Sequence, residues 1–155
     1  MRGEAGVERV LGFEDFTPGR VFDLGQRILS EGDIVAFAQD WDPQPMHLDP
    51  AALPPDGLIA SGWQTACVWM RMYVDGVLNH AAILAAPGVE ELRWLRPVRP
   101  GMALRGRATI LERWRSARQP DRGTIRLCGE LVTDDDDPVM TMQARGHVRL
   151  SQEQN

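Results

Sequence analysis

The sequence contains no lysine, so all 17 of its basic residues are arginines. A phosphate-binding loop of the lysine type is therefore excluded, and so is a lysine Schiff base with pyridoxal phosphate. The formal net charge is -5, whereas non-specific binding to nucleic acid needs a basic surface. We therefore expect no nucleic-acid partner.

Cysteine and histidine are also scarce. The two cysteines, Cys67 and Cys128, lie far apart and do not form a CxxC pair. This suits a reducing compartment and gives no disulfide framework. We interpret each cysteine as a small buried apolar group rather than as a nucleophile. With three histidines and no paired cysteines, we expect no metal site.

Long apolar runs are missing as well. No run approaches the roughly 20 residues that cross a bilayer, and residues 1–10 lack the apolar core of a secretory signal. We therefore expect a cytoplasmic protein without a membrane partner. A length of 155 residues is the usual size of one domain, so we predict a single domain over residues 1–155.

The N-terminal part predicts a strand followed by a short helix. Residues 21–29 are typical of a strand, and Ser30 is a suitable N-cap with Asp33 in the capping-box position. Apolar residues then follow at the spacing of one helix face: Ile34, Phe37, Ala38 and Trp41. This helix should end where a proline-rich segment begins at Asp42.

The longest predicted helix covers residues 58–78. Its apolar residues fall along one stripe: Trp63, Ala66, Cys67, Met70, Tyr73, Val74 and Val77. Further apolar residues lie beside that stripe, and a helix that is apolar over so much of its surface is usually buried.

After Pro87 and Gly88 the pattern changes to alternating strands, which we place at residues 89–98, 102–113, 123–133 and 139–150. Short links between them favour an antiparallel meander. The acidic run 134–137 is expected to be a hairpin turn, because it lacks the spaced ligands and glycine of a calcium loop. The whole order predicts an α+β fold, with a curved antiparallel sheet wrapped around one long helix.

An acid and an imidazole lie five residues apart in the segment DPQPMH, residues 42–47. Pro45 excludes a helix interior here, and the residue before each proline is pushed towards extended geometry. We therefore expect Asp42 and His47 on a stiff loop, where one water molecule could contact both side chains. Such a pair suits acid–base work on water.

Several separated motifs resemble the MaoC-like dehydratases, which include the (R)-specific enoyl-CoA hydratases and have the hotdog fold. They are FEDFTPG at 13–19, DPQPMHLDP at 42–50, IASGW at 59–63 and LRPVRPG at 95–101. The resemblance covers roughly residues 13–150, the core of the predicted domain. Gln44 stands where the family usually has asparagine, and Ser61 where many hydratases have histidine.

The resemblance implies a hydro-lyase that adds water reversibly to an enoyl thioester of coenzyme A or an acyl-carrier protein. Asp42 and His47 would be the catalytic pair, and Gly62 with Ser61 would bind the thioester carbonyl at the start of the central helix. No cofactor is implied, because coenzyme A or phosphopantetheine is only part of the substrate. A homodimer is the usual assembly of such proteins.

Other interpretations remain open at this stage. An Asp before Pro is a common turn initiator, and a lone His is usually structural or exposed. A hotdog acyl-CoA thioesterase or a non-catalytic acyl-thioester-binding protein would share the fold, which does not fix function. The arginines 93, 96 and 99 could meet the phosphates of coenzyme A or could form a solvated strand edge.

Overall fold

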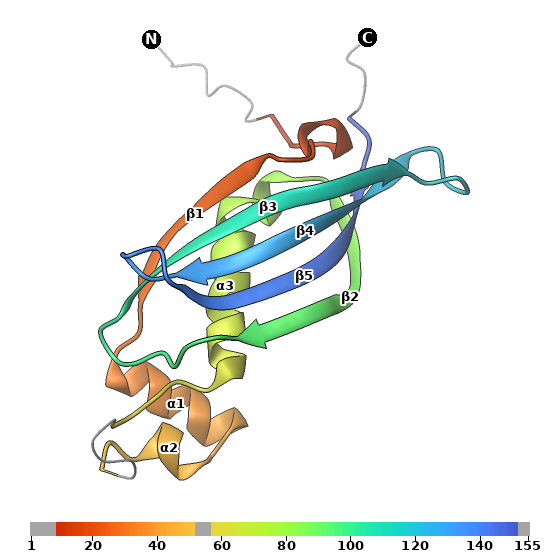
Figure 1. Cartoon of the computed structure of the whole chain (residues 1–155). Coiled ribbons are helices and arrows are strands. Elements are labelled where there is room, and N and C mark those ends of the chain that lie inside the picture. Colours follow the sequence, from red (N-terminus) through yellow and green to blue (C-terminus); the bar gives the residue numbers. More distant parts are fainter. Residues whose placement is uncertain (1–8, 52–56, 152–155) are drawn as a thin grey trace, which may run out of the picture.

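The computed structural model describes residues 9–51 and 57–151 (Figure 1). One antiparallel sheet has the strand order β1-β3-β4-β5-β2. Its strands are β1 (Val21–Ile28), β2 (Ile83–Trp94), β3 (Ala103–Arg115), β4 (Arg122–Val132) and β5 (Pro138–Arg149). The helices are α1 (Glu31–Trp41), α2 (Pro45–Leu48) and α3 (Gly62–Gly76), with 3-10 turns η1 (Phe13–Asp15) and η2 (Leu78–His80).

The predicted α+β architecture is confirmed. Helix α3 lies against one face of the sheet, while α1 and α2 lie together at one end of the molecule (Figure 1). Within the described ranges, none of the helices has the length and apolar character that crossing a membrane requires.

Helix α1 begins with the predicted capping box. The Asp33 N–H donates to Ser30 Oγ at 3.1 Å, and the Ser30 N–H donates to Asp33 Oδ2 at 2.9 Å. The helix ends at Asp42, its C-cap, because the residue before a proline disfavours helical geometry. Trp41 was expected on the apolar face, but this was wrong: it is 76% exposed.

The segment after α1 is not the loop that its prolines suggested. Residues 45–48 form the short helix α2, with Pro45 in its first turn. Proline is tolerated there because the N–H that it lacks would have no partner within the helix. His47 therefore lies on a helical turn, and its side chain is buried.

Helix α3 is shorter than predicted and buries a different face. Residues 57–60 are not helical, and the Ala60 N–H donates to Val98 O at 2.8 Å. The buried residues are Gln64, Thr65, Trp69, Met72 and Tyr73. Of the predicted stripe, Tyr73 and Val77 are buried, whereas Trp63 is 60% exposed and Met70 is 45% exposed.

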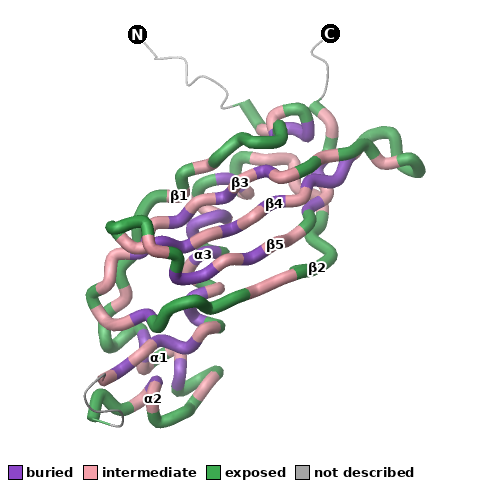
Figure 2. The backbone as a smooth tube through the Cα atoms, viewed as in Figure 1, coloured by how far each residue is buried: buried purple, intermediate pink, exposed green. Residues whose placement is uncertain are grey.

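The sheet contains the predicted meander β3-β4-β5, but β2 lies at its outer edge beside β5. Pro87 was expected to precede the strand, yet it lies inside β2, next to a register shift between Ala85 and Gly88. An edge strand accepts a proline because one of its sides needs no hydrogen bonds. Figure 2 shows that β2 is largely exposed, whereas buried positions recur along β4.

The acidic run forms the expected turn between β4 and β5. Asp136 has a positive φ of 62°, and its Oδ1 accepts a hydrogen bond from Arg105 Nη2 at 2.7 Å.

Two glycines on the inner face of the sheet make room for α3. A Cβ at Gly129 of β4 would lie 2.4 Å from Trp69 Cζ2, and a Cβ at Gly106 of β3 would lie 2.8 Å from Met72 Cε. Interiors are close-packed, so neither position has space for a methyl group. Trp69 is fixed further because its Nε1–H donates to Arg107 O at 3.0 Å.

We expect Gly129→Ala to lower the free energy of unfolding by about 1–3 kcal/mol, because the added methyl overpacks the Trp69 contact. Gly146→Ala is the matched control: it lies in β5, and its Cβ would meet Ile125 Cγ1 at an ordinary 3.6 Å. Urea titration of both variants measures the difference. Equal destabilisation by the two substitutions would contradict the packing argument.

Candidate active site

Asp42 and His47 are brought together at the junction of α1, α2 and α3. Asp42 Oδ2 lies 3.4 Å from His47 Nε2, and the two side chains are only 18% and 7% exposed. The C-cap of α1 places the carboxylate, and the turn of α2 places the imidazole. This separation is too short for a water molecule to lie on the line between the two atoms, but one water beside the pair can be within hydrogen-bonding distance of both.

A backbone carbonyl sets the tautomer of His47. His47 Nδ1 lies 2.8 Å from Ile59 O, and a carbonyl oxygen only accepts, so Nδ1 carries the hydrogen. In the neutral ring, Nε2 then presents a lone pair towards Asp42. Ile59 is itself held in place, because its N–H donates to Met46 O at 3.1 Å.

Two donors hold the Asp42 carboxylate. Ser61 Oγ–H donates to Oδ2 at 2.6 Å, and Gln44 Nε2 donates to Oδ1 at 2.7 Å. The Ser61 hydrogen bond, and after it that of Gln44, holds the pKa of Asp42 below its usual value. The carboxyl group is therefore ionised at neutral pH.

Ser61 and Gly62 form the start of α3. Ser61 is the N-cap, and its Oγ accepts from the Trp63 N–H at 3.3 Å while it donates its own proton to Asp42. Gly62 is the first helical residue. In the described part of the chain nothing accepts a hydrogen bond from its N–H. Such N–H groups carry the partial positive charge of a helix N-terminus.

A cavity of about 280 Å³ extends from His47 to Gly62; we call it the site pocket. Its other lining residues are Ile59, Ala60, Thr65, Trp94, Leu95, Arg96, Pro97 and Val98. The Trp94 indole lies so close to Gly62 that a Cβ there would be 2.6 Å from the ring. Of the four residues expected at the site, His47 and Gly62 line this pocket, while Asp42 and Ser61 are not among its lining residues and are joined to the site through the contacts described above.

Sequence reasoning missed several parts of this site. The Ile59 carbonyl is a backbone atom and leaves no side-chain signal. Trp94 lies in strand β2, far from the site motifs in the sequence, and was not connected with the site. Gln64 was overlooked: it is buried, its Nε2 donates to Asp33 O of α1 at 2.9 Å, and its Oε1 finds no partner within the described residues. A glutamine in the first turn of an apolar helix was the available signal.

Two further expectations concern side chains near the site. Of the three arginines 93, 96 and 99, Arg96 lines the site pocket, and its Nη2 lies 3.3 Å from Asp137 Oδ1. Cys67 was expected to be buried, but it is exposed on α3. The residues in the described ranges contain no cluster of three or more His, Cys, Asp or Glu side chains arranged to hold a metal ion.

Comparison with solved structures identifies the fold as the hotdog fold. The chain is 33% identical to a MaoC-like dehydratase from Rhodospirillum rubrum, covering 92% of this chain and 99% of that one, with a TM-score of 0.83. A Mycobacterium tuberculosis protein with a double hotdog fold is 18% identical over 94% of this chain and 46% of its own, with a TM-score of 0.75.

A third solved structure, the unliganded (R)-hydratase PhaJ1 from Pseudomonas aeruginosa, shares the fold. It is 19% identical, covers 94% of this chain and 95% of its own, and gives a TM-score of 0.68. Residues 15–127 match the protein family described as the MaoC like domain. Because this match spans most of the sequence and includes all four site residues, the chain belongs to the MaoC-like dehydratase family.

Proposed function

We propose that this protein catalyses the reversible hydration of an enoyl thioester to a 3-hydroxyacyl thioester, carried by coenzyme A or an acyl-carrier protein. The observation that carries the proposal is the 3.4 Å separation of His47 Nε2 from Asp42 Oδ2. Both atoms are acceptors when His47 is neutral, so a shared donor beside the pair would satisfy both. A water molecule fills this need, because it can donate one hydrogen to each.

The reaction must deliver a hydroxyl to Cβ and a proton to Cα. In the proposed mechanism, His47 Nε2 accepts one proton from the bound water while the water oxygen attacks Cβ. Asp42 orients the water through the second hydrogen and, being ionised, stabilises the imidazolium. The imidazolium then returns the proton to Cα, and dehydration follows the same steps in reverse.

Negative charge on the thioester oxygen needs a separate donor. We propose the Gly62 N–H for this role, because it opens α3 and borders the site pocket. Ser61 was expected to share this role, but its hydroxyl proton is already directed at Asp42. Its proposed part is therefore to hold the carboxylate and cap the helix. The reaction needs no cofactor beyond the carrier within the substrate.

We also propose a homodimer formed along β2. This strand is an unpaired sheet edge, and exposed apolar side chains gather on it and on the neighbouring face of α3: Trp63, Met70, Val89 and Trp94. Exposed edges of this kind can pair with another chain, and two-fold dimers are the commonest homo-oligomers.

Asp42→Asn and His47→Ala are each expected to slow the hydration of crotonyl-CoA by about 10²–10⁴-fold, because each removes one of the two groups that act on water. Loss of enoyl absorbance measures the rate. Asp40→Asn and His80→Ala are the controls: both residues are exposed, and both variants should keep the wild-type rate.

Other outcomes of this assay separate the alternatives. Release of free coenzyme A from saturated acyl-CoA would indicate a thioesterase instead. Binding without turnover across a broad set of thioesters would indicate a non-catalytic binding protein.

Ser61→Ala is expected to move the acidic limb of the pH–rate profile to higher pH. The Ser61 hydrogen bond is the main cause that lowers the pKa of Asp42, so its loss raises that pKa and Asp42 becomes protonated at higher pH than in the wild type. Ser30→Ala is the matched control, because Ser30 caps α1 without contacting Asp42. If the acidic limb does not move in Ser61→Ala, protonation of Asp42 is not the cause of that limb.

Light scattering at micromolar concentration should give the mass of a dimer. Val89→Glu should shift it towards the monomer, because it places a charge on the β2 edge, where Val89 is 53% exposed. Val21→Glu tests the opposite edge of the sheet with a side chain that is 56% exposed, and it should leave the dimer intact. The reverse pattern would assign the contact to β1.

A further inference from the structure

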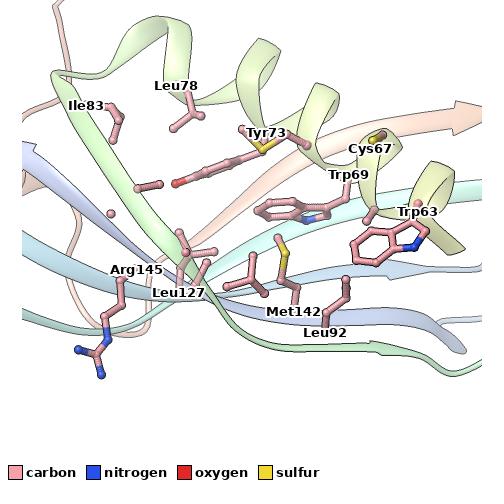
Figure 3. A pocket seen from close by; sticks show the side chains of 17 residues that line it. Trp63, Cys67, Trp69, Tyr73, Leu78, Ile83, Leu92, Leu127, Met142 and Arg145 are labelled. Atoms are coloured by element: carbon pink, nitrogen blue, oxygen red, sulfur yellow. The ribbon is translucent and has the colours of Figure 1, made fainter. Parts of the chain in front are cut away.

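A second cavity lies between α3 and the β2 edge of the sheet, and we call it the apolar cavity. Three of its lining residues, Trp63, Met70 and Val89, also belong to the surface proposed for the dimer contact, so the partner subunit would border this cavity. It has a volume of about 340 Å³. Figure 3 shows Trp63 and Leu92 towards one end, Trp69 and Met142 in the middle, and Tyr73, Leu78 and Ile83 towards the other. Its charged side chain is Arg145, and the rest of the lining is almost wholly apolar.

The apolar cavity and the site pocket share no lining residue, yet they are neighbours along both elements. On α3, Gly62 lines the site pocket and Trp63 the apolar cavity; on β2, Trp94 lines the site pocket and Leu92 the apolar cavity. Adjacent residues of one helix, and residues two apart on one strand, therefore line different cavities.

Two indole rings, one from the lining of each cavity, are in contact where the two sets of lining residues adjoin. Trp63 and Trp94 meet edge to face, with ring centroids 5.2 Å apart and planes at 77°. Such aromatic contacts contribute about 0.5–1.5 kcal/mol beyond the area that they bury. The Trp94 ring also packs against Gly62, where it occupies the place that a Cβ of residue 62 would take.

We infer that the Trp63–Trp94 pair limits acyl chain length, so that the protein accepts short acyl thioesters and excludes long ones from the apolar cavity. The inference rests on the proposed function, which puts the thioester oxygen at Gly62 and Cβ near His47. A longer hydrocarbon chain needs apolar space beyond the site pocket, and the apolar cavity is the adjoining space.

The chemistry of the apolar cavity identifies its occupant as hydrocarbon rather than as the carrier arm. A phosphopantetheine arm contains amides, and burying an amide without a partner costs about 1–3 kcal/mol. The apolar lining offers such amides few partners, whereas a methylene chain gains about 0.8 kcal/mol for each buried CH₂. Removal of the indole barrier should therefore favour longer acyl groups specifically.

The test compares butyryl-CoA with decanoyl-CoA, which are saturated and bind without being hydrated. Isothermal titration calorimetry gives the ratio of their dissociation constants for the wild type and for Trp94→Ala. We expect Trp94→Ala to shift this ratio at least about tenfold in favour of decanoyl-CoA, because the longer chain has several more methylenes to bury in the apolar cavity. Trp63→Ala should shift the ratio in the same direction and serves as a second variant if Trp94→Ala does not fold.

Two further variants make the result specific. Trp94→Phe keeps an aromatic ring over Gly62 and should retain the wild-type ratio. Ala66→Phe fills the apolar cavity from α3, so the double variant Trp94→Ala with Ala66→Phe should lose the gain for decanoyl-CoA. A ratio that stays at the wild-type value in both Trp94→Ala and Trp63→Ala would overturn the inference. So would a gain that survives Ala66→Phe.

Hydration of crotonyl-CoA and dec-2-enoyl-CoA by the same variants keeps the two proposals apart. A wild type that hydrates neither thioester contradicts the proposed reaction, while the calorimetric ratio still decides the role of the indole pair. Light scattering of each variant shows whether the dimer is retained. A shift in the ratio that occurs only in variants reduced to monomers would assign the effect to the subunit contact and overturn the inference.

Discussion

The hydrogen bond from Ser61 to Asp42 is the interaction on which the rest of the site depends. Asp42 is the C-cap of α1 and Ser61 is the N-cap of α3, so this 2.6 Å bond joins the two helices at the site, in addition to the bond from Gln64 to Asp33 O. A hydrogen bond to an ionised carboxylate is short and strong. The same Asp42 oxygen, Oδ2, faces His47 Nε2. The position of Ser61 at the start of α3 therefore sets the geometry of the Asp42–His47 pair.

Local signals were enough to predict much of the fold and the site. The capping box of Ser30 and Asp33 sets the start of α1, and Pro43 sets its end at Asp42. These are interactions between neighbours in the chain, which a sequence displays directly. The motifs around Asp42, His47 and Gly62, in their order, then indicated the family, and the structure places those residues together.

Contacts between distant parts of the chain determine the features of the fold that sequence patterns did not predict. Helix α3 is apolar on more than one face, so its periodicity did not reveal which side is buried. Gly106 and Gly129 determine which side of α3 is buried, because they leave room for Met72 and Trp69 on the sheet. The tautomer of His47 likewise depends on the backbone oxygen of Ile59. The edge position of β2, which accommodates Pro87, depends on its pairing with the distant β5.

Gly62 links the proposed chemistry to the proposed selectivity. Its N–H has no acceptor among the described residues, and its lack of a side chain lets the Trp94 indole lie against the backbone. A larger residue at 62 would disturb both features at once. Residue 94 belongs to β2, and no hydrogen bond or ion pair of the described residues joins its side chain to Asp42 or His47, so substitution there is expected to reshape the space for the acyl chain more than the pair that acts on water. Differences in acyl preference among proteins built this way should therefore arise on the strand rather than at the helix start.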